Sequence, residues 1–242
     1  MSTPTLLFGP VPSRRYGRSL GIDLVPMKTC CYDCLFCQLG PTPQTTCTRR
    51  DYVPLSEVYR QLEAWLAKGE PIDILTLCGS GEPTLHAHFG DVLDWIARHT
   101  GKPSLLMSNG ALFADPEVRA AAARASRVKI SLHFWDEASF RATVRPQSAL
   151  HFADIYAGWQ RFRSDFSGKL DLEFFAMPGI NTAPAAPEPY SEEALIALAR
   201  RHPLTPAQFA RYFAVSEETI VAALKRHHDP FADRALSTPP LS

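Results

Sequence analysis

Apolar positions follow two different spacings along the chain up to residue 180. In 56–68, Val58, Leu62 and Trp65 recur at the three-to-four-residue spacing of an amphipathic helix. Other apolar residues are grouped in short runs between turn residues, which is typical of buried strands. The pattern predicts strands at 20–26, 72–78, 104–109, 127–134 and 169–179, and helices at 56–68, 89–99, 115–125 and 148–166.

Strands and helices alternate along this part of the chain, and Asp115 followed by Pro116 marks the start of one helix. Such alternation is typical of an α/β fold with a parallel sheet, either a barrel or an open doubly wound sheet. In both architectures, functional residues collect at the C-terminal ends of the strands. Unusual sequences follow the first three strands: a cysteine-rich loop at 29–40, "GSGEPT" at 79–84 and "SNG" at 108–110.

The composition of the chain changes after Ile180. Thr205 and Gln208 fit a helix capping box, and Ser216 can cap a following helix, so this end predicts short helices with helix-turn-helix-like spacing. The predicted organisation is an α/β core at 1–182, a Pro/Ala-rich linker at 183–190, a small helical unit at 191–230 and a flexible tail at 231–242.

The composition of the chain narrows the classes of protein to which it can belong. The hydrophobic fraction of 45% supports a sizeable core, and 25 basic residues balance 25 acidic ones, so the net charge demands neither a nucleic acid nor a membrane partner. There is no charged-then-apolar leader and no long apolar run, so we expect no signal peptide or membrane span and a cytoplasmic location. Thiols stay reduced there, which makes metal binding a better interpretation of the six cysteines than disulfides.

Cys30, Cys34 and Cys37 form the pattern C-x3-C-x2-C. Three thiolates on one tight loop can hold an iron–sulfur cluster and leave one iron open to a further ligand, whereas clusters with four cysteine ligands normally carry electrons. A structural zinc ion is the alternative. It needs four ligands, so Cys30, Cys31 or Cys47 would have to complete the pair Cys34 and Cys37.

The loop resembles the radical S-adenosylmethionine (SAM) superfamily, which carries C-x3-C-x2-C after its first barrel strand. Phe36 matches the aromatic residue before the third cysteine, and "GSGEPT" is similar to the superfamily's "GGEP" motif. Residues 8–182 resemble the group that contains the wyosine-type tRNA synthetases and their uncharacterised bacterial relatives, with matches at "PVPSRR", "FRATVRP" and "MPGIN". The C-terminal helices resemble the small winged-helix-like unit of some relatives more weakly.

The resemblance implies that Cys30, Cys34 and Cys37 hold a [4Fe-4S] cluster. Cys31 stands where relatives usually have another residue, and we interpret it as a buried or spare thiol. The implied reaction is reductive cleavage of SAM at the cluster to a 5′-deoxyadenosyl radical, which removes a hydrogen atom from the substrate. A flavodoxin- or ferredoxin-like protein would supply the electron.

The same resemblance predicts SAM contacts at the strand ends. Glu82 either lies near the SAM ammonium or only fixes its loop, and Arg145 either contacts the SAM carboxylate or is an ordinary surface residue. His133 replaces an acidic residue of the relatives and is either part of a substrate pocket or structural. The residues expected to bind the cofactor are Phe36, Gly79, Ser80, Gly81, Glu82, Ser108, Asn109, Ser131 and Arg145.

Two features depart from the family pattern. The wyosine-type synthetases have upstream cysteines for a second cluster, and this chain has none before Cys30, so that reaction is in doubt. The chain is also shorter than a six-unit core by about thirty residues. We therefore expect a partial barrel of five to six parallel strands, with an exposed edge that invites a partner strand or a homodimer.

The leading hypothesis is a radical SAM enzyme that acts on RNA or on a small metabolite. RNA is suggested by the resemblance, by the C-terminal helices and by a group of arginines near the N-terminus, Arg14, Arg15, Arg18, Arg49 and Arg50. The alternatives are a non-catalytic, cluster-binding regulatory protein and a zinc-dependent nucleic-acid-binding protein. We favour a structural role for the C-terminal helices, because no basic recognition face stands out.

Overall fold

The computed structural model describes residues 5–177, 181, 190–201, 205–213 and 215–227. These residues form two compact units. The first contains the described residues of Met1–Cys31, Pro43–Leu132 and Gln147–Phe174, and the second contains those of Tyr32–Thr42, His133–Pro146 and Phe175–Ser242. The predicted linker up to residue 189 and the predicted tail lie outside the described residues.

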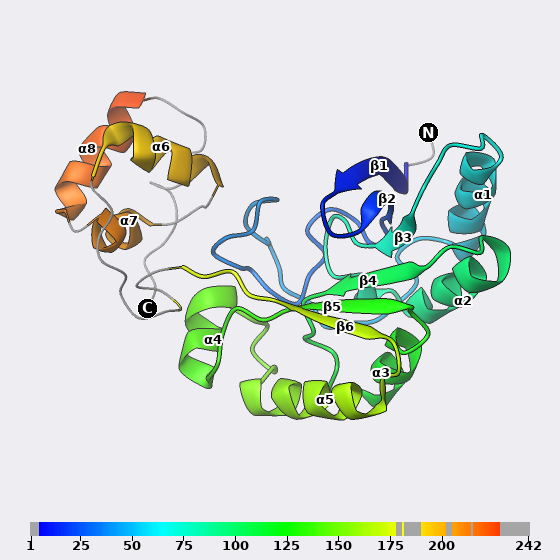
Figure 1. Ribbon diagram of the computed structural model, residues 1–242. Coiled ribbons are helices and arrows are strands. Elements are labelled where there is room, and N and C mark those ends of the chain that lie inside the picture. Colours follow the sequence, from blue (N-terminus) through cyan, green and yellow to red (C-terminus); the bar gives the residue numbers. More distant parts are fainter. Residues whose placement is uncertain (1–4, 178–180, 182–189, 202–204, 214, 228–242) are drawn as a thin grey trace. The chain divides into compact units, whose positions relative to one another are not determined.

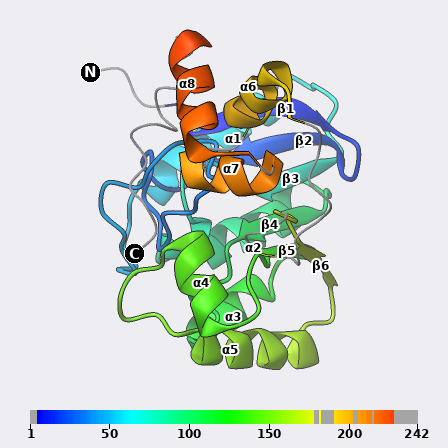
Figure 2. The same cartoon turned by 90° about the vertical axis from the view of Figure 1, so that its left-hand side faces the viewer.

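The first unit is built on a sheet of six strands that follow one another in sequence order (Figure 2). The first two strands pair in antiparallel fashion, and every later neighbour pair is parallel. The strands are β1 (Leu7–Ser13), β2 (Gly17–Ile22), β3 (Ile74–Leu77), β4 (Ser104–Ser108), β5 (Arg127–Ser131) and β6 (Lys169–Glu173). The expected α/β fold with five to six parallel strands is therefore confirmed.

Helices cover one face of this sheet (Figure 1). They bury apolar stripes, such as Val58 and Leu62 of α1, against strands whose residues are buried on both faces. The helix α3 begins as its sequence predicts, because the Asp115 carboxylate accepts from the amide of Glu117 and Pro116 follows it. The helices are α1 (Leu55–Leu66), α2 (Phe89–His99), α3 (Pro116–Ala122) and α5 (Phe152–Asp165), with a 3₁₀ turn, η1, at Pro83–Leu85.

The apolar pattern did not predict β1. Gly9, Pro10 and Pro12 lie within it, and proline lacks the amide that a central strand needs. The strand tolerates them because it is at the edge of the sheet and its pairing with β2 shifts register between Phe8 and Val11.

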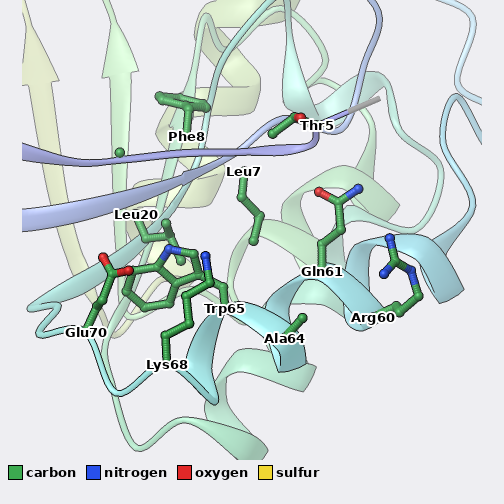
Figure 3. Close-up of a pocket in the computed structure, with 11 residues that line it drawn as sticks. Thr5, Leu7, Phe8, Leu20, Arg60, Gln61, Ala64, Trp65, Lys68 and Glu70 are labelled. Atoms are coloured by element: carbon green, nitrogen blue, oxygen red, sulfur yellow. The ribbon is translucent and has the colours of Figure 1, made fainter. Parts of the chain in front are cut away.

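A cavity of about 360 Å³ lies between this hairpin and α1. Leu7 points from β1 towards the helix, where Trp65 and Gln61 line the cavity, whereas Phe8 points to the other side of the strand (Figure 3). The ring of Phe8 occupies the space over Gly21 that a Cβ atom would need. None of the described residues that we expect to bind the cluster or SAM lines this cavity.

The second unit contains a helix that the sequence pattern did not predict, α4 (Glu137–Val144). A capping box starts it, in which the Asp136 carboxylate accepts from the amide of Ser139 and the Ser139 hydroxyl accepts from the amide of Asp136. The rings of Tyr32, Phe134 and Phe140 pack against one another beside this helix.

Three further helices of the second unit share an apolar core of their own: α6 (Glu192–Arg201), α7 (Pro206–Phe213) and α8 (Glu217–His227). The predicted capping box is present, since the Gln208 side chain accepts from the amide of Thr205 at 2.7 Å. The Ser216 hydroxyl accepts from the amide of Thr219, as expected for a helix cap. In the described part of the chain, no helix is long and apolar enough to cross a membrane.

Candidate functional site

Cys30 belongs to the first unit and lies beyond the C-terminal end of β2. Its carbonyl accepts from the amide of Thr46 at 2.9 Å, which holds the start of the cysteine loop. The Asn109 side-chain amide donates to the Cys30 sulfur over 3.4 Å. Hydrogen bonds from amides to sulfur are typical of cysteine ligands of iron–sulfur clusters.

Cys34 and Cys37 belong to the second unit. The amide of Cys37 donates to the carbonyl of Cys34 at 3.2 Å, which forms a turn with both thiols partly exposed. The amide of Leu35 bonds to the carbonyl of Thr143, so the last turn of α4 anchors this part of the loop. Among the described residues, no three side chains of the metal-binding types are already placed around one point.

Cys31 is completely buried in the first unit, and its thiol is hydrogen-bonded to the half-buried Cys47. That hydrogen bond, together with burial, raises the pKa of Cys31 well above its usual range, while it lowers the pKa of Cys47. The shifts are opposite because Cys31 is the donor and Cys47 the acceptor. This placement fits the interpretation of Cys31 as a core thiol.

The "GSGEPT" loop after β3 is bound to the segment that leads into Cys30. Ser80 accepts from the amide of Lys28 at 2.7 Å, and the amide of Glu82 donates to the carbonyl of Thr29 at 2.9 Å. Gly81 permits this second bond, because a Cβ atom there would lie 1.9 Å from the Thr29 oxygen. Gly81 therefore makes a close contact with the protein's own backbone, and its expected contact with the cofactor stays a prediction.

Gly79 adopts φ +141°, and a Cβ atom there would collide with the carboxylate of Asp23. That carboxylate accepts from the amide of Ser80 at 2.9 Å. The loop therefore has a fixed shape before any ligand binds.

Glu82 is the centre of a buried hydrogen-bond network, with only 2% of its surface exposed. Its carboxylate accepts from the amide and hydroxyl of Thr84, from the hydroxyl of Ser108 at 2.8 Å and from the amide of Asn109 at 2.7 Å. Burial raises its pKa, which these four donors partly oppose. The network joins the ends of β3 and β4, which is the loop-fixing role that the sequence left open for Glu82.

Ser108 ends β4 and Asn109 follows it directly, while Ser131 ends β5. They lie at the same edge of the parallel sheet as Cys30 and the "GSGEPT" loop, as the strand-end argument predicts. Ser108 is buried and its hydroxyl is used by Glu82, whereas Ser131 is partly exposed. The side-chain carbonyl of Asn109 accepts from the amide of Ala111, so both ends of this amide are oriented.

Phe36 lies in the second unit with its ring edge-on to His133, at 4.5 Å between centroids. His133 is buried, and its Nδ1 accepts from the amide of Phe175 at 3.0 Å. Its carbonyl accepts from the side-chain amide of Asn181, which is 1% exposed and also donates to the carbonyl of Phe175. His133 therefore makes structural contacts within the second unit, and its part in a substrate pocket stays a prediction. No role for Asn181 was predicted from the sequence, although "MPGIN" contributed to the resemblance.

Arg145 follows α4 in a left-handed backbone conformation, with φ 43°. Its guanidinium pairs with the carboxylate of Asp33 at 2.9 Å and donates to the carbonyl of the same residue at 2.7 Å. This pair ties the cysteine loop to the end of α4 within the second unit. The expected contact of Arg145 with the SAM carboxylate stays a prediction.

No family model matches the chain, and its sequence relatives include several UPF0026 proteins. The chain is 37% identical over 169 residues to the UPF0026 protein slr1464 of Synechocystis, covering 69% of this chain and 63% of that protein. It is 33% identical over 194 residues to the UPF0026 protein MJ1312 of Methanocaldococcus jannaschii, covering 79% of this chain and 58% of that protein. The chain is a sequence homologue of these proteins and spans less than two thirds of their length.

The structure is similar to that of native anSMEcpe with bound AdoMet, which is SAM, with a TM-score of 0.50 and 12% identity. The match covers 86% of this chain and 59% of that one. A structure of TYW1 with a lysine-pyruvate adduct bound has a TM-score of 0.49 and 16% identity, covering 68% of this chain and 57% of that one. The first match shows that the chain has a partial radical SAM barrel fold, so the fold class expected from the sequence is confirmed.

Proposed function

We propose that the protein is a radical SAM enzyme whose [4Fe-4S] cluster is held by Cys30, Cys34 and Cys37. The observation that carries the proposal is the hydrogen bond from the Asn109 side chain to the Cys30 sulfur. It links the first cysteine of the C-x3-C-x2-C loop to a residue at the end of β4, beside a fixed "GSGEPT" loop. The radical SAM fold supports the same interpretation.

The donor set fits the cluster. All three thiols are partly exposed and free of disulfides, and Cys31 is withdrawn into the core by its bond to Cys47. Three thiolates leave one iron of the cluster without a protein ligand. A structural zinc ion, in contrast, needs four protein ligands. When bound, the reduced cluster supplies the electron that cleaves the sulfonium bond of SAM and so generates the radical.

The chain's own residues would position and shield this chemistry. The Asn109 amide orients the Cys30 sulfur by donating a hydrogen bond to it. The carbonyl of Ser80 accepts one bond, from Lys28, and its second lone pair can accept from the SAM ammonium. Glu82 holds the two strand ends together through donors that it already satisfies, so it acts as a positioning residue.

The proposed substrate is RNA or a small metabolite. With tRNA as the substrate, the protein would be a tRNA-modifying oxidoreductase. A flavodoxin- or ferredoxin-like protein in the cytoplasm would deliver the electron. The outer edge of β6 is the place for a partner strand or a second copy of the chain, and Leu172 on this strand is 58% exposed.

The test is anaerobic reconstitution with iron and sulfide, followed by reduction with dithionite in the presence of SAM and detection of 5′-deoxyadenosine. Cys30→Ala, Cys34→Ala and Cys37→Ala should each abolish product and lower the iron content. Cys31→Ala is the matched control and should retain both. Zinc without iron or sulfide in the anaerobically purified protein would exclude the proposal. A stable cluster that never cleaves SAM would favour the regulatory alternative.

A further inference from the structure

A second cavity, of about 300 Å³, opens within the first unit beside the start of the cysteine loop. Its lining comes from 28–29 and from 44–52, and every lining side chain is polar. Four of these residues are threonines, two are the cations Lys28 and Arg50, and neither aspartate nor glutamate is among them. Cationic and hydroxyl groups without carboxylates make this cavity attractive to an anion.

Arg50 is held in place from both its backbone and its side chain. Its amide donates to the carbonyl of Leu85, and its carbonyl accepts from the amide of Ala87, which fixes the main chain as a short bridge beside His86. Its guanidinium lies over the ring of Tyr52, 4.6 Å from the centroid. A guanidinium held in this way is oriented before a ligand arrives.

The neighbouring residue, Arg49, differs from Arg50 because its guanidinium pairs with carboxylates of the protein. Arg49 is within 3.7 Å of the carboxylates of Asp115 and Glu117 and donates to the carbonyls of Thr84 and Ala87. Its charge is used within the fold. Arg50 forms no ion pair with any residue in the described part of the chain, so its donors are available to a ligand.

Lys28 enters the cavity from an unusual backbone conformation. It is a non-glycine residue at φ 62°, in the left-handed region that costs about 1 kcal/mol or more for such residues. The amide of Lys28 bonds to Ser80, and the next residue, Thr29, bonds to Glu82. These bonds join the wall of the cavity to the "GSGEPT" loop. Lys28, which is part of this wall, precedes Cys30 by two residues.

We propose that this cavity binds a phosphate group of the substrate. A guanidinium donates two parallel bonds to phosphate oxygens, an ammonium adds a point charge, and threonine hydroxyls can complete the contacts. The ligand is a phosphorylated small molecule or the backbone of RNA, which share this chemistry. The assignment of the ligand as substrate rests on the proposed function, because the cavity adjoins the loops assigned there to SAM and the cluster.

The test is titration of the full chain, with its cluster reconstituted but not reduced, by isothermal calorimetry. Ribose 5-phosphate is one probe, ribose is its unphosphorylated control, and a short single-stranded RNA is the second probe. Arg50→Gln removes the guanidinium, and Lys28→Asn removes the ammonium while keeping a residue that tolerates a left-handed backbone. Arg161→Gln removes a charge from an exposed residue of α5 outside the cavity and is the matched control.

We expect saturable binding of ribose 5-phosphate or RNA and none of ribose. Arg50→Gln and Lys28→Asn should each weaken binding about tenfold or more, and Arg161→Gln should leave it within about twofold. Binding of the small ester identifies a metabolite site, whereas RNA binding alone, with a strong salt dependence, identifies a backbone site.

Absence of saturable binding to both phosphate probes would overturn the proposal. So would equal weakening by Arg50→Gln and Arg161→Gln. Lys28→Asn provides a second reading should Arg50→Gln fold poorly, which circular dichroism would reveal. The titration needs no electron and no SAM cleavage, so failure of phosphate binding and failure of 5′-deoxyadenosine formation are separate results.

Discussion

The hydroxyl of Tyr16 lies 3.3 Å from a carboxylate oxygen of Asp171, which joins the turn of the β1–β2 hairpin to β6, the strand at the opposite end of the sheet. Arg15 pairs with Glu173 beside it at 3.4 Å. The guanidinium of Arg127 lies over the Tyr16 ring and 2.7 Å from Asp171. Side chains therefore connect the two ends of a sheet whose backbone ladder does not close.

Asp171→Asn should destabilise this connection. The change removes the charge that Arg127 pairs with and weakens the bond to Tyr16, and because these groups are only partly buried the expected loss in the free energy of unfolding is about 1 kcal/mol. Urea unfolding measures it. Asp165→Asn, at the exposed end of α5, is the control and should change the free energy by less than half as much. Equal effects of the two changes would show that the connection adds no stability.

The sequence predicted the parallel strands and their helices because burial imposes periodic apolar positions on both. It missed β1, because the prolines in this edge strand are not typical of strands. It also missed α4, a short helix with little apolar periodicity, although Asp136 and Ser139 form a capping box there. The connection between Tyr16 and Asp171 was also beyond prediction. It joins polar residues 155 positions apart, and no local pattern records such a pair.

The candidate site was predictable where spacing encodes the chemistry. The three cysteines, "GSGEPT" and "SNG" stand out in the sequence alone, and the structure brings the Asn109 side chain within 3.4 Å of the Cys30 sulfur. The network around Glu82 was not foreseen, because its four donors come from two separate strand ends. The hydrogen bond between Cys31 and Cys47 was not foreseen either. It depends on the path of the loop between these two residues, which no local sequence pattern specifies.

Glu82→Gln should destabilise the protein although the two side chains have nearly the same shape. The glutamine amide cannot accept from the donors that face one carboxylate oxygen, so at least one buried donor loses its partner. The expected loss in the free energy of unfolding is about 1–3 kcal/mol. Glu63→Gln on the exposed side of α1 is the control. Denaturant unfolding that gives equal values for the two variants would contradict the structural role of the network.

Gly81→Ala should disturb the site more than any alanine on the protein surface. A Cβ atom would lie 1.9 Å from the carbonyl oxygen of Thr29, so the "GSGEPT" loop would have to move away and lose the bond from Glu82 to Thr29. We expect a loss of about 1–3 kcal/mol in the free energy of unfolding. Glu63→Ala places an alanine on the exposed side of α1, where it meets no such contact, and is the control. Calorimetric melting temperatures that fall equally in both variants would show that the contact with Thr29 is unimportant.

His86 should make stability depend on pH below neutrality. It is completely buried, its Nδ1 accepts from the amide of His88, and burial lowers its pKa from the ordinary value of 6.5. The unfolded chain then binds a proton at a pH where the folded protein does not, so the stabilisation is complete above pH 6.5 and is lost as the pH falls through the folded pKa.

Urea unfolding between pH 8 and pH 5 checks this dependence (about three pH units, which span the histidine range). The difference in free energy of unfolding between the wild type and His86→Gln should shrink as the pH falls, because glutamine binds no proton in either state. Parallel pH profiles for the wild type and His86→Gln would show that the buried imidazole is not the group that senses pH. His86 supports the main chain of Arg50 through the short bridge between them, so its protonation should also loosen the proposed phosphate cavity.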